Sequence, residues 1–572
     1  MIKKESADYA VRGLELHSLY AWDYTWIMKV MDIMTKLEMN TLVLHRNDFV
    51  DAMVYPGKYF GYQAKDGDRS IFDVYGQIFR KVYQYTPTRR SCVYQKRVFL
   101  KRVLEQAKRR GFNVYIENKE LYFPEILLEF YPELVHDGHV CATDPFWLDF
   151  LKEKYTEFFR DFPEVAGIIT SPATGESKVS IKSNRCTCER CRSTSKEDWF
   201  RSILYAMYDV LHGAGKDLII RDFVFDPKAQ QEIATVMEQL PEDVIISLKN
   251  TPHDYYPTFP VNPRIGRVGH HRQWIEFDTL GQYYGGGLGV GNLMEDYRKR
   301  LKDAREKGAT GAIFRLDWES LDGHTSFGTP NKLNVYSAGH LTRNLDTPSP
   351  DIYLDFLNSE GWISGGGNTD EGIRWFQSVM EKTWDVTSKT IFINGCVFSD
   401  SSVMPISVEH AVWLAEEKNS LKDWDPSKAL SLSPVRTSVE AALSEKDDAL
   451  EMAEALWERS KAYPKEICAD KAQWLSSWMW MNREYVRMFR SAARSILLAR
   501  YLQESNEIDE AYRAEKKKQL EQELAAMEVL EGDFRVFFNS TDYKPHIVYT
   551  LLDPDRIECL RRNIRRMNAG DA

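Results

Sequence analysis

Short apolar runs rich in β-branched residues alternate with longer amphipathic stretches through the first three fifths of the chain. The short runs predict buried strands, and apolar residues spaced i, i+3, i+4, as in TWIMKVMDIMTKLEMN and VFLKRVLEQAKRRGF, predict helices between them. We expect eight strands, at residues 13–17, 41–45, 113–117, 165–170, 217–221, 244–248, 274–278 and 311–316.

Eight strand–helix alternations are what a (β/α)₈ barrel requires, and a doubly wound sheet is the alternative. After residue 348 strand-like runs nearly vanish, except at 390–397, and helical patterns take over at 440–461, 469–503 and 508–530. The sequence therefore predicts an α/β fold: a TIM barrel over residues 1–345, followed by a mostly α-helical domain over residues 346–572.

Composition and charge narrow the class of function. Of the 572 residues, 43% are hydrophobic and 13% are aromatic, which is typical of a globular protein and also suits sugar binding. The net charge of −10, without a long basic run, argues against a nucleic-acid partner. No apolar run approaches the ~20 residues of a membrane span.

Two short segments bear on cofactor and location. The glycine-rich stretch GGGLGVGN at 285–292 has no phosphate-loop lysine, so a nucleotide cofactor is not expected. The N-terminal MIKKESADYAVRG has no apolar core of a signal peptide, so a cytoplasmic location is expected. A leader that had been trimmed away would leave the same trace.

A (β/α)₈ barrel carries its chemistry at the C-terminal ends of its strands. The predicted strand ends are rich in carboxylates and cations. In chain order the candidates are Trp22, Asp23, Glu176, Arg221, Lys249, His253, Asp254, Glu276, Asp278, Arg315, Asp317 and Glu319. His253 is a candidate substrate contact, and a packed or solvent-exposed histidine is the equal alternative.

Paired carboxylates across a barrel mouth suit glycoside hydrolysis, in which one donates a proton and the other activates water or attacks. Cations at the same rim predict an anionic substrate, because arginine binds carboxylates through forked hydrogen bonds. The sequence therefore predicts an enzyme that hydrolyses an anionic oligosaccharide.

Five stretches resemble glycoside hydrolase family 67, the α-glucuronidases that act on xylan-derived oligosaccharides. They are ATDPFWLDFLKEKYTEFFRDFPEVAGIITSPATGE, DLIIRDFVF, DVIISLKNTPHD, QWIEFDTLGQYYG and GTPNKLNVYSAGHLTRN. The resemblance runs from residue 11 to at least residue 361, and a distant related barrel family is the alternative.

The resemblance implies roles for individual residues. Glu176 matches the family's general acid, and Asp254 matches one of its two candidate bases. Lys249 and Arg221 match cations that hold the uronate carboxylate. Trp22 and Asp23 resemble the Trp-Asp pair that follows the first strand of the family. The family's inverting stereochemistry is implied in the same way.

Two family positions differ in this chain. The second carboxylate on the base side falls on Gln282, which can orient water but cannot act as a base. If the chemistry is intact, Asp254 is the base, or Glu276 or Asp278 replaces the lost carboxylate. A third carboxylate-binding lysine falls near Ser171 or Pro172. The family also has an N-terminal β-domain that is not expected here.

The motif C-x-C-x-x-C at Cys186, Cys188 and Cys191 has metal-ligand spacing, and a structural zinc is expected there. A tetrahedral zinc site needs a fourth ligand, for which His212, Cys141 or a distant histidine are candidates. A disulfide within the loop and reduced cysteines without a metal are the alternatives.

Together these features predict an exo-acting glycoside hydrolase that removes a terminal uronic acid or a related sugar without a catalytic cofactor. Its partner would be an oligosaccharide, not nucleic acid or a membrane, and the resemblance implies a homodimer. One rival is a hexosaminidase-type barrel that retains the anomeric configuration with help from its substrate. The other is a catalytically inactive sugar-binding barrel, which Gln282 suggests.

Overall fold

The computed structural model describes residues 7–60, 87–321, 323–363, 369–428, 432–506, 509–540, 542 and 544–569. Residues 1–6 of the predicted first domain and Ile508 of the predicted third C-terminal helix lie outside this part. The chain forms two compact units, each built from several segments. The first consists of Met1–Asn250, Asn262–Phe277 and Lys302–Arg315, and the second of Thr251–Val261, Asp278–Leu301 and Leu316–Ala572. The boundary at 345/346 stays a prediction.

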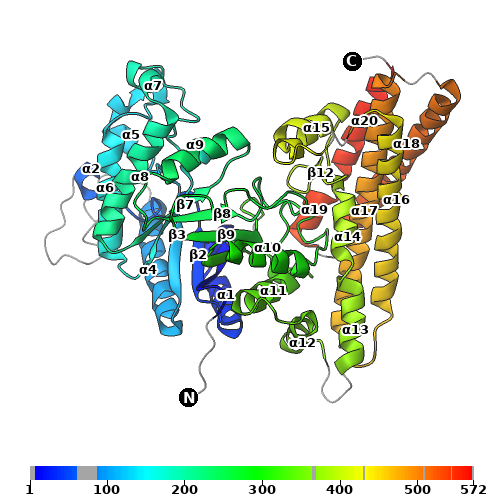
Figure 1. Ribbon diagram of the computed structural model, residues 1–572, viewed down its shortest axis with the longest axis horizontal. Coiled ribbons are helices and arrows are strands. Elements are labelled where there is room, and N and C mark those ends of the chain that lie inside the picture. The colour runs from blue at the N-terminus through cyan, green and yellow to red at the C-terminus, as the bar shows by residue number, and fades with distance from the viewer. Residues whose placement is uncertain are drawn as a thin grey trace. The chain divides into compact units, whose positions relative to one another are not determined.

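Eight parallel strands close into a barrel, which confirms the predicted fold class (Figure 1). They follow one another around the barrel in chain order, and the last lies beside the first. The strands are β1 (Val11–Leu16), β2 (Thr41–His45), β3 (Asn113–Glu117), β6 (Gly167–Thr170), β7 (Asp217–Asp222), β8 (Ile245–Lys249), β9 (Gln273–Asp278) and β10 (Gly311–Arg315). Each predicted strand is present and deviates by at most two residues at either end.

Helices follow the strands of the barrel unit, as the alternating pattern predicts (Figure 1). They are α1 (Tyr24–Lys36), α2 (Gly57–Phe60), α4 (Pro87–Arg110), α5 (Leu127–Phe130), α6 (Phe146–Asp161), α7 (Glu189–Ser193), α8 (Lys196–Gly213) and α9 (Pro227–Met237). The long helix α10 (Met294–Glu306) has residues in both units. A two-stranded ribbon, β4 (Val135–His136) with β5 (His139–Val140), precedes α6.

Apolar side chains from the strands fill the barrel interior. The cluster consists of Val43, Tyr115, Ile169, Ile219, Ile245, Trp274 and Ile313, with Val11 packed against it. Trp274 fits because Gly311 has no side chain: a Cβ there would lie 2.5 Å from the indole Cδ1. All eight strands therefore contribute to one closed core, as barrel interiors require.

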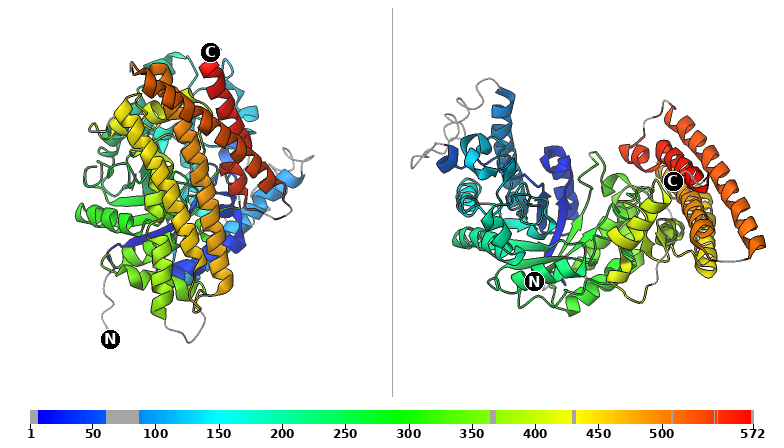
Figure 2. Two further views of the ribbon diagram at one scale, coloured as in Figure 1. Left: turned by 90° about the vertical axis from the view of Figure 1, so that its right-hand side faces the viewer. Right: turned by 90° about the horizontal axis from the view of Figure 1, so that it is seen from above.

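The second unit is mostly helical, as the change of composition predicts. Its helices beyond α10 are α11 (Lys332–Arg343), α12 (Ser349–Ser359), α13 (Thr369–Met380), α14 (Thr383–Thr390), α15 (Val408–Trp413), α16 (Arg436–Lys461), α17 (Ala469–Glu504), α18 (Glu510–Phe538), α19 (His546–Leu551) and α20 (Pro554–Ala569). The predicted strand at 390–397 is a hairpin of β11 (Phe392–Ile393) and β12 (Cys396–Val397). Figure 2 shows α16, α17, α18 and α20 side by side.

Packing on α17 holds this helical region together. Val486 of α17 joins Ala449, Ala453 and Leu456 of α16 and Val386 of α14 in one buried cluster. Neighbouring helices cover these apolar stripes. This packing stabilises the long helices, because isolated helices gain little stability in water.

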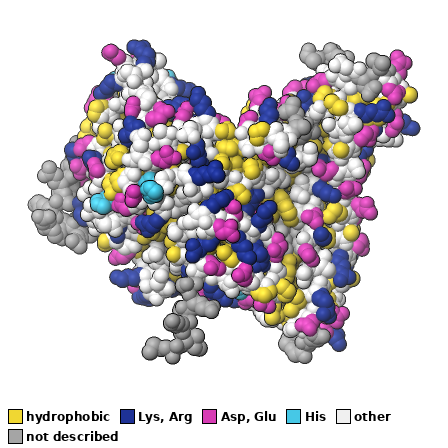
Figure 3. Space-filling model, in the orientation of Figure 1, with side chains coloured by type: hydrophobic (Ala, Val, Ile, Leu, Met, Phe, Trp, Pro, Cys, Tyr) yellow, Lys and Arg dark blue, Asp and Glu magenta, His cyan; other side chains and the backbone are white. Residues whose placement is uncertain are grey.

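Among the described residues, no helix has both the length and the apolar character needed to cross a membrane. On the face that Figure 3 shows, basic and acidic side chains are interspersed, without a broad patch of one sign. This distribution agrees with the small charge density that a net charge of −10 gives a chain of 572 residues.

Candidate active site

A buried layer of polar side chains lies above the apolar core of the barrel. Side chains of a strand point to the same face at every second residue, so the residues two and four positions after a core residue also point inward. These residues, one from each strand or the position directly after it, are Glu15, His45, Glu117, Ser171, Arg221, Ser247, Glu276 and Arg315. All eight are at least 95% buried. They form the floor of the C-terminal mouth, where a (β/α)₈ barrel carries its chemistry.

Arg221 holds two of the three carboxylates in this layer. Its Nε lies 2.8 Å and 3.0 Å from the two oxygens of Glu276, and a terminal nitrogen lies 2.6 Å from one of them. The other terminal nitrogen donates to Glu117 at 2.5 Å. Ser247 donates to Glu276 at 2.6 Å. The predicted substrate cation Arg221 therefore binds protein carboxylates, because buried charges need charged partners.

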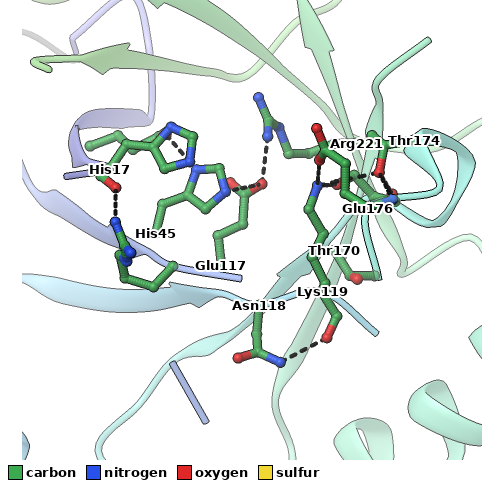
Figure 4. A network of polar contacts seen from close by, with 12 residues as sticks. His17, His45, Glu117, Asn118, Lys119, Thr170, Thr174, Glu176 and Arg221 are labelled. Carbon is green, nitrogen blue, oxygen red and sulfur yellow. Dashed lines mark hydrogen bonds and ion pairs between the residues drawn. The ribbon is translucent and has the colours of Figure 1, made fainter. Parts of the chain in front are cut away.

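The remaining contacts of the layer centre on His45 (Figure 4). Its Nδ1 lies 2.8 Å from Glu15 and its Nε2 lies 3.1 Å from Glu117. The ring also stacks on His17, with centroids 3.5 Å apart. Neither Glu15 nor His45 was a predicted site residue.

Burial decides the charges in this cluster. Burial first, and then the charge of Glu117, raises the pKa of Glu15 well above its usual range. Burial also lowers the pKa of His45 well below its usual range, with His17 and Arg221 adding to the effect. A neutral His45 can accept a hydrogen bond at Nδ1 from a protonated Glu15, which lies 2.8 Å away.

Glu176 and Lys119 meet at the rim of this mouth (Figure 4). The Lys119 ammonium lies 2.6 Å from Oε2 of Glu176 and donates to Ser171 Oγ at 2.6 Å. The lysine side chain is 2% exposed, whereas the glutamate is 45% exposed. Lys119 lies two residues after β3, and its ammonium lies beside Ser171, one of the two positions near which the resemblance to family 67 would place a lysine.

The cations around Glu176 control its ionisation. Burial alone would raise the pKa of Glu176, but Lys119, and then Lys249 and Arg221, outweigh it and hold the pKa below its usual range. Glu176 is therefore a carboxylate at neutral pH when no substrate is bound. A proton donor in hydrolysis needs the opposite shift, so its environment must change when a substrate arrives.

Lys249 contributes the second ammonium of the rim. It extends from the end of β8, and its Nζ lies 3.4 Å from the centre of the Phe223 ring, which follows β7. Lys119 Nζ lies 5.5 Å from the same ring. Two ammonium groups therefore lie near the Phe223 ring, and an aromatic ring of this kind suits the C–H face of a sugar.

Of the predicted pair, Trp22 is the last residue of a 3₁₀ turn (Leu19–Trp22), and Asp23 lies between this turn and α1. The Asp23 carboxylate accepts a hydrogen bond from the Trp26 backbone N–H at 3.0 Å and so caps α1. Trp22 stacks on Phe49, with ring centroids 4.1 Å apart. Both residues have structural contacts, and their substrate roles stay predictions.

Six further candidates belong to the second unit: His253, Asp254, Asp278, Gln282, Asp317 and Glu319. Asp278 accepts hydrogen bonds from the backbone N–H groups of Leu280, Gly281 and Gln282 at 2.9, 3.2 and 2.8 Å, so it organises the turn after β9. Such multiple donors stabilise a carboxylate and compete with any role as a base. The side chain of Gln282 is buried in the same turn.

His253 and Asp254 lie in another turn of the second unit. Asp254 has a positive φ of 47°, which a non-glycine residue adopts at an energetic cost. His253 Nε2 lies 3.2 Å from Asn419 Oδ1 and 3.8 Å from Asp254 Oδ2. His253 is therefore a buried, hydrogen-bonded histidine, and the role of Asp254 as base stays a prediction.

The structure places a fourth cysteine beside the three of the C-x-C-x-x-C motif. Cys141, from the segment between β5 and α6, lies with Cys186, Cys188 and Cys191 in one cluster. His212, another candidate for the fourth position, contacts Asp243 and Tyr208 at the exposed end of α8 instead. Of the candidates, Cys141 is the one that the structure brings to the motif.

Comparisons with known proteins show the fold alone. No protein-family model and no curated protein matches the chain. A solved enzyme of glycoside hydrolase family 138, which targets the pectin rhamnogalacturonan II, matches with a TM-score of 0.60 and 14% identity. The match covers 92% of this chain and 62% of that enzyme, so the chain spans less than two thirds of its length.

Two further solved structures match less closely. The family 89 glycoside hydrolase of Clostridium perfringens has a TM-score of 0.48 and 11% identity, over 98% of this chain and 59% of that one. A family 115 4-O-methyl-α-glucuronidase, BtGH115A, has a TM-score of 0.44 and 13% identity, over 97% and 62%. The resemblance to family 67 stays a prediction.

Proposed function

We propose that this chain is a glycoside hydrolase that removes a sugar bearing a carboxylate from an oligosaccharide, with Glu176 as proton donor. The observation that carries the proposal is the 2.6 Å ion pair between Glu176 and Lys119 at the barrel mouth. The family 138 enzyme, which shares the fold, targets a pectin, and this is consistent with the proposal.

The ion pair gives an anionic substrate a specific part in the chemistry. A substrate carboxylate that binds Lys119 competes with Glu176 for the same ammonium. Once Glu176 loses this partner, the burial that already acts on it raises its pKa, and it can hold the proton that the leaving oxygen needs. A neutral sugar leaves the Lys119–Glu176 pair intact and so leaves Glu176 ionised.

The other residues have distinct roles in this proposal. Lys249 and Phe223 bind the sugar through charge and stacking, with inversion as the family 67 resemblance implies. Arg221 is a positioning residue, because it holds Glu117 and Glu276 rather than the substrate. No cofactor takes part.

The test is hydrolysis of matched substrates by the wild type and by Glu176→Gln. We expect release of uronic acid from uronic oligosaccharides, and a loss of about 10²–10⁴-fold in Glu176→Gln. The loss should be much smaller with nitrophenyl uronides, because a nitrophenolate leaves without protonation. An equal loss with both substrates would contradict a proton-donor role.

The same experiment separates the rivals. Turnover of N-acetylhexosaminides but not of uronides, with retention at the anomeric carbon by NMR, would favour the hexosaminidase-type barrel. Binding of uronic oligosaccharides without any turnover would favour an inactive sugar-binding barrel. Either result would overturn the proposal.

A further inference from the structure

The cluster of four cysteines lies outside the barrel mouth and has no part in the proposed hydrolysis. Cys141 follows the β4–β5 ribbon, Cys186 and Cys188 come from the loop that leads from Glu176 to α7, and Cys191 lies in α7 itself. The four Sγ atoms all lie within 4.8 Å of one another, and Cys141 Sγ is 3.7 Å from Cys188 Sγ and 3.6 Å from Cys191 Sγ. Three of the side chains are buried and Cys188 is half-buried.

These separations fit a shared metal ion rather than disulfides. A disulfide brings two sulfur atoms to about 2.05 Å. Four thiolates around a tetrahedral zinc, each at about 2.3 Å, lie about 3.8 Å from one another. All four cysteines are free thiols in the structure.

Hydrogen-bonding groups lie beside the sulfur atoms. Thr143 Oγ1 lies 3.2 Å from Cys191 Sγ and 3.6 Å from Cys141 Sγ, and the Cys191 backbone N–H donates to Cys188 Sγ at 3.4 Å. Hydrogen bonds of this kind orient metal ligands and reduce the charge on sulfur. Arg190, between two of the cysteines in sequence, pairs with Asp144 at 2.8 Å beside the cluster and brings a positive charge to it.

We propose that Cys141, Cys186, Cys188 and Cys191 bind one zinc ion in a closed tetrathiolate site. Four protein ligands leave no position for water or substrate, so the ion is structural. A tetrahedral set of four sulfurs suits zinc or iron, and the close C-x-C-x-x-C spacing within one loop is typical of structural zinc sites.

The site also has a structural consequence for the loop that carries Glu176. Lys182 Nζ donates to the Ala173 carbonyl at 2.7 Å, and Ser183 Oγ donates to the Gly175 carbonyl at 3.1 Å. These contacts join the segment just before Cys186 to the residues just before Glu176. On the other side, indole N–H groups of Trp147 and Trp199 hold the carbonyls of Cys141 and Ala142 at 2.8 and 2.7 Å. The zinc would therefore fix the Glu176 loop to the start of α6.

The first experiment measures the metal content of the purified full-length protein by mass spectrometry, after loading with zinc chloride and desalting. We expect about one zinc per chain in the wild type and in Cys92→Ser, which removes an exposed cysteine elsewhere. Cys141→Ser and Cys188→Ser should each lose the ion. Zinc-free wild type, iron in its place, or full occupancy in Cys141→Ser would overturn the proposal.

Two further measurements use the wild type, so their outcome does not depend on whether the cysteine variants fold. A mercurial reagent added with a chromophoric chelator should release the zinc, and thiol titration of the denatured protein should find all eight cysteines reduced. Hydrogen exchange of residues 171–195 should rise after chelation and return with added zinc. Four missing thiols, or exchange that does not respond, would count against the site or against its effect on the loop.

None of these measurements depends on enzymatic activity. The proposed zinc site and the proposed hydrolysis can therefore fail independently.

Discussion

At the scale of single residues, Lys119 explains why the candidate acid is ionised in the free protein. The Lys119 side chain is 98% buried, and its ammonium contacts both Glu176 and Ser171. A buried ammonium without such a partner would be costly, so the pair is stable until another carboxylate takes its place. Lys119 is thus both the proposed substrate cation and the group that sets the state of Glu176.

Replacing Lys119 by methionine should shift the pH dependence of hydrolysis. Lys119 lowers the pKa of Glu176, so its removal should raise that pKa and keep the proton donor protonated to higher pH. We expect the alkaline limb of kcat/KM for a uronic oligosaccharide, whose leaving oxygen needs the proton, to lie at higher pH than in the wild type. For a uronide, KM should rise because the carboxylate loses its partner.

Lys152→Met is the matched control, since Lys152 lies on the exposed side of α6 and pairs with Asp209 at 3.2 Å. It should leave both the pH profile and KM unchanged. An alkaline limb that stays in place in Lys119→Met would show that Lys119 does not control the proton donor.

Asp222 offers a prediction on stability. Burial raises its pKa to about 6, although Gln230 donates to it at 2.6 Å. The unfolded chain releases this proton at about pH 3.9, so the folded state holds it more tightly. The group therefore stabilises the fold at low pH, and about 3 kcal/mol is lost as the pH rises through 6.

Asp222→Asn should remove this loss, because the amide stays neutral. The difference in Tm between Asp222→Asn and the wild type should be more positive at pH 8 than at pH 4.5, measured by calorimetry. Asp209→Asn, which changes an exposed carboxylate, should show no such trend. A difference that is the same at both pH values would contradict the raised pKa.

At the scale of elements, neighbouring strands of the barrel fit one another by size. The indole of Trp274 on β9 occupies the space beside Gly311 on β10, and its edge meets Tyr115 of β3 with centroids 5.1 Å apart. The Trp274 side chain thus fills space in the barrel interior that several smaller side chains would otherwise fill.

Gly311→Ala should destabilise the barrel. The new Cβ would lie 2.5 Å from Cδ1 and 2.8 Å from Cγ of Trp274, and an overpacked core typically costs about 1–3 kcal/mol. The measurement is the change in the midpoint of urea unfolding, followed by tryptophan fluorescence.

Gly213→Ala is the control, because a Cβ at this last position of α8 meets nothing within 4 Å. It should leave stability unchanged or raise it slightly, since alanine favours a helix over glycine. Equal effects of the two substitutions would show that the contact between Trp274 and Gly311 does not limit packing.

At the scale of the whole molecule, segments before residue 345 belong to the helical second unit. The glycine-rich stretch 285–292, which the sequence leaves unexplained, is buried there. Gly285 N–H donates to Ser402 Oγ at 2.7 Å, and the carbonyls of Leu288 and Val290 accept from Asn482 and Thr387 at 2.9 and 2.7 Å. The absent side chains let the backbone approach these partners.

A chain ending at residue 345 should therefore fail to fold in isolation. It would expose buried side chains such as Tyr284, Leu288 and Val290 and leave their backbone groups without partners. We expect insoluble protein or no cooperative thermal transition. Co-expression with a fragment of residues 346–572 should restore solubility, and a soluble 1–345 chain with a sharp transition would contradict the expectation.

The sequence by itself determined the elements of this protein. Strands such as 41–45 and 113–117 are predicted to the residue, because their apolar, β-branched runs are a local property of the chain. The C-terminal helices follow from local periodicity in the same way. The period of two along the strands, carried two to four residues past each core position, is the signal that could also have found Glu15, His45 and Glu117.

Only the tertiary structure decided which side chains meet. Closing the barrel brings Lys119 to Ser171, 52 residues away, and Cys141 to Cys191, 50 residues away. It also turns Arg221 toward Glu117, 104 residues away. The physical reason is that the partner of a charge or a thiolate is chosen by distance in space and by burial, and neither quantity is local in the chain.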